Sequence, residues 1–72
     1  MSFSDEVIQE VWEKATPIYG CDVSKIRKDH FDNLIKREDY ENKTSTYGWK
    51  IDRISSAILD SISNLRPLKI NE

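Results

Sequence analysis

The sequence has little cysteine, glycine and proline, and it has no long apolar run. Cys21 is the only cysteine, so neither an intrachain disulfide nor a cysteine-based zinc site can form, which fits a reducing compartment. Two glycines and two prolines are too few for a low-complexity or disordered chain. No stretch of about eighteen apolar residues occurs, which excludes a membrane-spanning helix.

The chain begins with acidic residues and lacks the basic region and apolar run of a secretion signal. We therefore expect a cytoplasmic protein without a membrane partner. A chain of 72 residues has room for one domain, residues 1–72, which buries only about 60% of the surface of the unfolded chain. Nearly every large apolar side chain is needed for such a small core. The sequence thus predicts a binding surface rather than a deep substrate pocket.

Charge is unevenly placed, although the net charge is only −2. Residues 1–22 carry five acidic side chains against Lys14. In residues 23–37, Asp29 and Asp32 are outnumbered by the basic residues Lys25, Arg27, Lys28, Lys36 and Arg37. Such a stretch can face phosphates, but solvated charges on the strands of a hairpin are a commoner reason for it.

The first half of the chain is expected to form a helix and a hairpin. Apolar residues recur at helical spacing over residues 4–15, and Pro17 ends this pattern. Trp12 on this helix is expected to be a core anchor rather than a stacking surface for a ligand. Residues 26–31 and 34–36 flank Asp32-Asn33, a pair that tolerates tight-turn dihedrals.

In the second half of the chain, the spacing of the apolar residues changes from that of a strand to that of a helix. Residues 47–52 have the aromatic and β-branched content of a strand. From Ile54 to Leu65 the apolar residues step by three or four, which predicts a second amphipathic helix near residues 53–63, before Pro67 breaks the pattern. A strand and loop retained over 53–63 is the alternative. Together these elements predict an α+β fold.

Several short stretches between about residues 7 and 68 resemble a small bacterial and phage branch of HNH endonucleases. The specific ones are Gly-Trp-x-Ile-Asp, ending at Asp52, and Asn-Leu-Arg-Pro-Leu, beginning at Asn64. The other matching stretches are residues 12–17, Arg27-Lys28-Asp29, Ile35-Lys36-Arg37 and Tyr40. The resemblance implies a ββα-metal module, preceded here by a helix and a hairpin.

The resemblance implies a chemical role for three positions of this sequence, Asp52, Arg53 and Asn64. Asp52 matches the aspartate that contacts the metal, and Asn64 matches the asparagine that orients the loop holding the general base. The next position after Asp52, however, is Arg53 where the family has its general-base histidine. A guanidinium has no free acceptor and a pKa above about 12, so it cannot deprotonate water near neutral pH.

The rest of the family's metal site is also altered. The stretch from Ile54 to Asn64 is shorter than the family's and helix-prone, so we expect the module's second strand to be lost. Lys69 and Ile70 stand where histidine or glutamine and tryptophan are common, and Asn71 is the nearest substitute for a final ligand, out of register. A catalytic cation needs a fixed coordination geometry. We therefore expect no catalytic residues, no metal and no cofactor.

No other chemistry is indicated. His30 has no cysteine or histidine at ligand spacing, so we expect a structural or solvated histidine rather than a metal ligand. The leading hypothesis is a degenerate HNH-like domain, encoded by a phage or mobile element, that binds another protein as a regulator or inhibitor. The alternatives are a non-cleaving nucleic-acid-binding protein, a residual metal-dependent nuclease and a homodimer. Nucleic acid would be contacted by the five basic residues of the 23–37 stretch together with Arg53.

Overall fold

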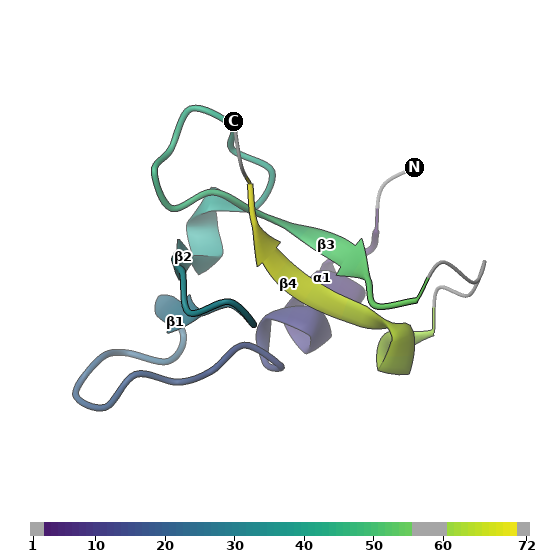
Figure 1. The fold of residues 1–72 in the computed structure, drawn as a ribbon, viewed down its shortest axis with the longest axis horizontal. Helices are drawn as coiled ribbons and strands as arrows, with labels where there is room; N and C mark the ends of the chain where they lie inside the picture. The colour runs from purple at the N-terminus through teal and green to yellow at the C-terminus, as the bar shows by residue number, and fades with distance from the viewer. Residues whose placement is uncertain (1–2, 56–60, 71–72) are drawn as a thin grey trace.

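The computed structural model describes residues 3–55 and 61–70. Over these residues it has one α-helix and two antiparallel hairpins, each a separate two-stranded sheet, which confirms the predicted α+β class. Figure 1 shows α1 behind the hairpin of β3 and β4, with the hairpin of β1 and β2 to one side. The three units meet around a shared apolar core.

Helix α1, Asp5–Trp12, begins where the sequence provides a cap. The Ser4 hydroxyl accepts a hydrogen bond from the backbone N–H of Val7 at 3.2 Å, and acidic side chains in the first turn favour the helix dipole. Its buried residues are Ile8, Val11 and Trp12. The helix is shorter than the predicted range 4–15, because the chain then turns and Thr16 pairs with Lys28.

The first hairpin joins β1, Ile26–Lys28, to β2, Leu34–Lys36. The strands are antiparallel, and Arg27 lies opposite Ile35. The turn between them includes Asp32, whose φ of 71° lies in the left-handed region that aspartate tolerates. The hairpin was predicted correctly, but β1 ends before the expected residue 31 because Asp29 already forms the turn, with its N–H bonded to the Asn33 carbonyl.

The second hairpin corrects two expectations. β3, Trp49–Arg53, pairs antiparallel with β4, Leu65–Lys69, so the strand expected to be lost is present. Arg53 belongs to β3, and Ile62–Asn64 is a short 3-10 helix, η2, so the predicted helix near 53–63 is wrong at both ends. Residues 56–60 of that prediction lie outside the described residues.

Two tryptophans form the centre of the core. Trp12 and Trp49 are fully buried, with ring centroids 5.3 Å apart, and Tyr40 packs on Trp49 with centroids 4.9 Å apart. The Trp12 indole N–H donates to the Val23 carbonyl at 3.1 Å, so its one polar atom is satisfied. The prediction of Trp12 as a core anchor is confirmed. The other buried apolar residues are Ile8, Val11, Ala15, Ile35 and Leu65.

The connection from β2 to β3 is fixed by its own hydrogen bonds. It begins with a short 3-10 helix, η1, Arg37–Asp39. The Ser45 hydroxyl donates to the Asp39 carboxylate at 2.5 Å, and the Glu41 N–H donates to the Trp49 carbonyl at 2.7 Å. Since these bonds return the loop to the start of β3, the connection holds both hairpins in one arrangement.

Candidate functional site

Asp52 and Arg66 form an ion pair across the second hairpin. They lie opposite each other in β3 and β4, and the Arg66 Nε donates to the Asp52 Oδ2 at 3.0 Å. The Asp52 side chain is 32% exposed and the Arg66 side chain is 25% exposed. The Arg66 guanidinium also lies over the Phe31 ring, 5.3 Å from its centroid. The carboxylate that the resemblance assigns to a metal is therefore bound to a guanidinium.

Sequence reasoning missed Arg66 as a functional neighbour of Asp52. Arg66 was visible in the Asn-Leu-Arg-Pro-Leu stretch, and opposite charges facing each other in a hairpin are a recognised pairing. The opposite charges of Asp52 and Arg66 become informative only when the register of β3 and β4 is known. The second of these strands was not expected from the sequence.

Asn64 lies at the end of the second hairpin where the connecting loop begins and ends. Its backbone carbonyl accepts from the Ile54 N–H at 2.8 Å, and its side-chain Oδ1 accepts from the Ser55 N–H at 3.0 Å. Two bonds to successive residues after β3 hold this end of the strand against the start of β4. The matched asparagine is therefore built into the backbone of the hairpin.

A metal-ligand cluster is absent from residues 3–55 and 61–70, where no three His, Cys, Asp or Glu side chains gather closely enough to hold an ion. His30 packs edge to face on Phe31, with ring centroids 5.7 Å apart. In the same part of the chain, no helix is long and apolar enough to cross a membrane.

The basic residues singled out from the sequence do not form one patch. Arg27 faces the core side of the first hairpin, over the Trp12 ring at 5.9 Å from its centroid. Its Nε donates to the Val23 carbonyl at 2.8 Å, and its Nη1 donates to the carbonyls of Glu13 and Ala15 at 3.1 and 3.0 Å. Arg27 therefore acts as a clamp between segments of the fold.

Lys28 and Lys36 lie on the opposite, outer face of the first hairpin. Residues directly opposite in an antiparallel pair share a face, so Ile26 and Lys36 lie beside Lys28 and Leu34. Lys28 pairs with Asp32 at 3.6 Å. Lys36 lies over the Tyr47 ring, 4.9 Å from its centroid.

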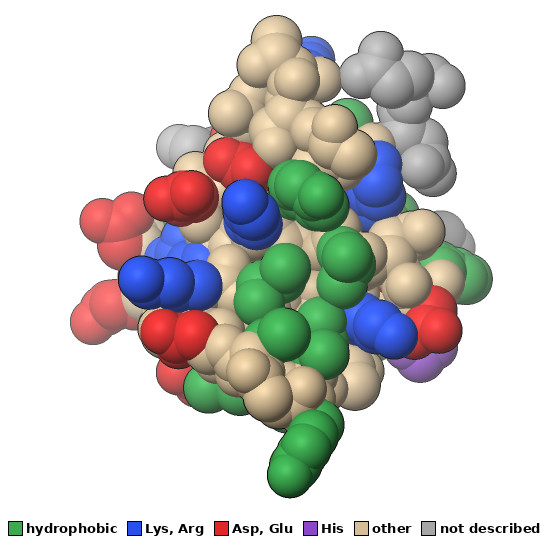
Figure 2. Space-filling view, turned by 90° about the vertical axis from the view of Figure 1, so that its left-hand side faces the viewer, with side chains coloured by type: hydrophobic (Ala, Val, Ile, Leu, Met, Phe, Trp, Pro, Cys, Tyr) green, Lys and Arg blue, Asp and Glu red, His purple; other side chains and the backbone are tan. Residues whose placement is uncertain are grey.

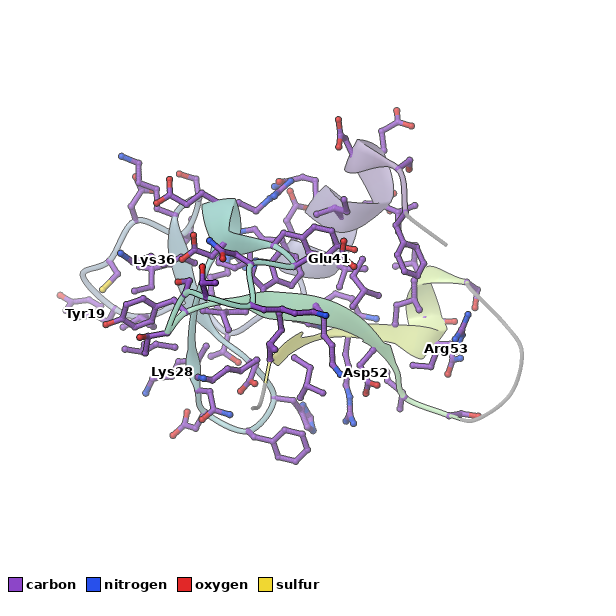
Figure 3. The ribbon with its side chains drawn as sticks, turned by 90° about the horizontal axis from the view of Figure 1, so that it is seen from above. Tyr19, Lys28, Lys36, Glu41, Asp52 and Arg53 are labelled. Carbon is purple, nitrogen blue, oxygen red and sulfur yellow. The ribbon has the colours of Figure 1, made fainter. Side chains whose placement is uncertain are left out.

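Arg53 and Arg37 are separated from this outer face. Figure 3 shows Lys28 and Lys36 toward the same end of the molecule as Tyr19, and Arg53 toward the other end. The Arg37 Nε donates to the Gln9 side chain of α1 at 3.0 Å. Of the six basic residues, only Lys25, Lys28 and Lys36 therefore remain as a common set around the first hairpin.

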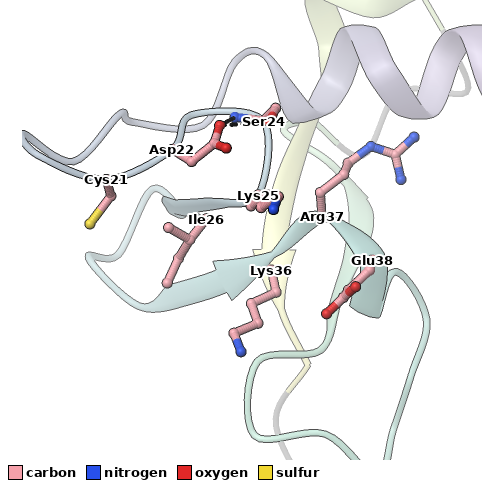
Figure 4. A pocket seen from close by; sticks show the side chains of 8 residues that line it. All are labelled: Cys21, Asp22, Ser24, Lys25, Ile26, Lys36, Arg37 and Glu38. Carbon is pink, nitrogen blue, oxygen red and sulfur yellow. Dashed lines mark hydrogen bonds between the residues drawn. The ribbon is translucent and has the colours of Figure 1, made fainter.

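A cavity lies beside these lysines, and we call it the hairpin groove. It has a volume of about 640 Å³ and is formed by the segment before β1, by β1 and β2, and by the start of η1 (Figure 4). Its lining residues are Cys21, Asp22, Ser24, Lys25, Ile26, Lys36, Arg37 and Glu38. Only Lys25, Lys36 and Arg37 were among the sequence candidates.

The Asp22 carboxylate in the groove accepts hydrogen bonds from a residue of its own loop. The Asp22 Oδ1 accepts from both the hydroxyl and the backbone N–H of Ser24, at 2.6 and 2.9 Å. The hydroxyl bond, followed by the backbone bond, holds the pKa of Asp22 below its ordinary value. Asp22 thus stays charged at neutral pH and shapes the loop that borders Lys25.

Apolar side chains are also exposed in the segment before β1 and in β2. Figure 2, which views the face of the first hairpin, shows a band of hydrophobic side chains bordered by basic and acidic ones. Tyr19 is fully exposed, and Val23 and Leu34 are 43% and 39% exposed.

Comparisons of the chain with protein-family models, with curated proteins and with solved structures find no match.

Proposed function

We propose that this chain is a catalytically inactive, HNH-like domain that acts as a protein-binding module, regulating or inhibiting its partner. The observation that carries the proposal is the 3.0 Å ion pair between Asp52 and Arg66. A carboxylate paired with a guanidinium offers little to a divalent cation, because the cation would have to displace a fixed positive charge.

The adjacent residue removes the second catalytic requirement. Arg53 stands where the resemblance puts the general base, and a guanidinium cannot accept a proton from water. General base catalysis contributes roughly 10²- to 10⁴-fold, and a metal supplies several kcal/mol more. Without either contribution, phosphodiester cleavage is expected to be negligible.

Protein binding is supported by the outer face of the first hairpin. This face combines the half-buried Ile26 and the exposed Leu34 with Lys28 and Lys36, and the hairpin groove lies beside it. A 72-residue chain has little apolar surface to spare from its core. Apolar side chains left exposed on one face therefore favour a docking role.

The catalytic half of the proposal is tested with supercoiled plasmid in the presence of magnesium, manganese, nickel or zinc. We expect no nicking by the purified protein. The Asp52→Ala variant is the control for contamination, because nicking that persists in this variant comes from another protein. Cation-dependent nicking that disappears in Asp52→Ala would overturn the proposal and establish a residual nuclease.

The binding half is tested by capture from a bacterial lysate, followed by cross-linking. We expect a protein recovered in stoichiometric amount, and its loss when Leu34→Glu places a charge on the outer face. Lys50→Glu, on the exposed side of β3, is the matched control and should retain the partner. Recovery of nucleic acid alone would contradict protein binding.

A non-cleaving nucleic-acid-binding protein is the second candidate, favoured by the placing of Lys25, Lys28 and Lys36 around one hairpin. Binding through phosphates weakens steeply as salt rises. With Arg27 and Arg37 hydrogen-bonded to other segments of the chain and Arg53 at the far end, few cations remain for a backbone of phosphates. A titration with duplex DNA at low and high salt decides this candidate, which fails if no salt-sensitive binding is seen.

A further inference from the structure

We infer that the hairpin groove binds an extended, acidic segment of a partner protein, with an apolar side chain over Ile26 and carboxylates directed at Lys25 and Lys36. The inference rests on the proposed protein-binding function and names its surface and the chemistry of its partner.

The charges of the groove are incompletely matched inside the molecule. Among the described residues, no ion pair includes Lys25 or Lys36, although Lys25 lies close enough to Asp22 to act on its carboxylate electrostatically. Lys36 contacts the face of the Tyr47 ring instead. Both ammonium groups therefore have donor capacity for a ligand's carboxylates.

The third cation of the lining is directed elsewhere. Figure 4 shows the Arg37 guanidinium turned toward α1 and away from Lys36, in agreement with its 3.0 Å bond to Gln9. Lys25 and Lys36 are consequently the two cations that a ligand in the groove can engage, and any test of the groove must target them.

Ile26 gives the groove an apolar side chain beside Lys36. It follows Lys25 in the chain and lies opposite Lys36 in the sheet register, and Figure 4 shows Ile26 and Lys36 on the same side of the hairpin. A ligand that presents an acidic and an apolar side chain on one face matches the neighbouring Lys36 and Ile26. An extended chain has the required spacing, because alternate side chains point the same way.

The acidic members of the lining favour a peptide over a nucleic acid. Asp22 and Glu38 border the same groove, and both would repel a continuous row of phosphates. A peptide segment carries backbone N–H donors as well as carboxylates, so it can satisfy the acids and the lysines together. Charge complementarity therefore selects a protein ligand of mixed acidic and apolar character.

The test is an amide-resonance titration of the full chain with the acetylated peptide Asp-Glu-Leu-Asp-Leu-Glu. We expect shifts confined to residues 21–26 and 36–38. Lys25→Glu and Lys36→Glu should each weaken binding by roughly tenfold or more. Lys50→Glu makes the same charge change on β3 and should alter the affinity less than twofold. The amide spectra of the free variants show directly whether each one is folded.

Several results would overturn the inference. These are no shifts at about 1 mM peptide, equal binding of a peptide with lysine in place of the acidic residues, or shifts away from the groove. Groove shifts caused by duplex DNA alone would assign the surface to nucleic acid, and concentration-dependent shifts without a ligand would assign it to a second copy of the chain. A further outcome is that the peptide causes no shifts in the groove while a protein is still captured from lysate and its capture is lost in Leu34→Glu. In that case the proposed function stands, and only the inference that this groove is the binding site is wrong.

Discussion

The buried carboxylate of Asp29 accepts a hydrogen bond from the backbone N–H of Lys69 at 2.9 Å, joining the turn of the first hairpin to the last strand of the second. Asp29 is only 2% exposed. Its other bonds come from the backbone N–H groups of Phe31 and Asn33 and from the Asn33 amide. One side chain therefore shapes a turn and fastens two hairpins that share no strand pairing.

This carboxylate predicts a loss of stability in acid. Burial alone would raise the pKa of Asp29, but the bonds from Lys69, Asn33 and Phe31 together hold it below the ordinary 3.8. A folded-state pKa below the unfolded one stabilises the protein fully above the unfolded value, and the contribution is lost as pH falls through the folded value. Urea unfolding should accordingly show a falling unfolding free energy below about pH 4.

Asp29→Asn should lower the unfolding free energy by roughly 2 kcal/mol at pH 7. Both carboxylate oxygens of Asp29 accept hydrogen bonds, whereas an amide has only one oxygen that can accept. The part of the acid dependence due to this group should disappear as well. Asp32→Asn is the matched control, since this exposed side chain has only its long pair with Lys28, and we expect a change within about 0.5 kcal/mol. Equal stability of the two variants would refute the role given to Asp29.

The Asp52–Arg66 pair should show a modest coupling energy. A double-mutant cycle of Asp52→Asn and Arg66→Gln is expected to give roughly 0.5 to 1 kcal/mol, because both side chains are partly exposed and solvent screens the pair. The coupling should shrink as salt is added. A coupling indistinguishable from zero at low salt would remove the argument that Arg66 occupies the carboxylate.

Gly48 and Gly20 should respond differently to alanine. A Cβ at Gly48 would overlap the backbone carbonyl of Asn42, so the connection to β3 must shift, at a cost of about 1 to 3 kcal/mol. Gly20 has a φ of 85° with open space around it, so Gly20→Ala carries only backbone strain, about 1 kcal/mol. Thermal unfolding of both variants measures the difference, and an equally stable Gly48→Ala would argue against this loop geometry.

The tryptophans should be inaccessible to a quencher in the folded protein. Trp12 and Trp49 are fully buried, so acrylamide should quench their fluorescence weakly before urea unfolding and strongly after it. Trp12→Phe keeps an aromatic ring but loses the bond to the Val23 carbonyl, and we expect it to cost roughly 2 kcal/mol. Strong quenching of the native protein would contradict the burial of the pair.

The local elements were predictable where the signals are local. The apolar spacing over residues 4–15 predicted α1, and Asp32-Asn33 predicted the first turn. The element ends were less accurate because tertiary pairing sets them. Helix α1 stops early where Thr16 pairs with Lys28, and β1 stops early where Asp29 forms its turn.

The prediction of a helix near 53–63 failed at its described ends because apolar spacing alone cannot show that two segments pair. Pro67 was taken as a break, yet it lies within β4 opposite Ile51. Hydrogen bonds join Ile54 to Asn64 and Ile70 to Gly48, so strict alternation makes Ile51 and Pro67 a pair that exchanges no hydrogen bonds. A proline that lacks an N–H is tolerated at such a position.

The sequence by itself determined that Arg53 cannot accept a proton, since that follows from the guanidinium and from no other residue. Only the tertiary structure decided that Asp52 meets Arg66, that Arg27 faces the core, and that Arg53 lies far from Lys28 and Lys36. These outcomes depend on register and packing between distant segments, such as the bond from Lys69 to Asp29, 40 residues apart. Side-chain chemistry is fixed residue by residue, whereas the neighbours of a side chain are chosen by the whole fold.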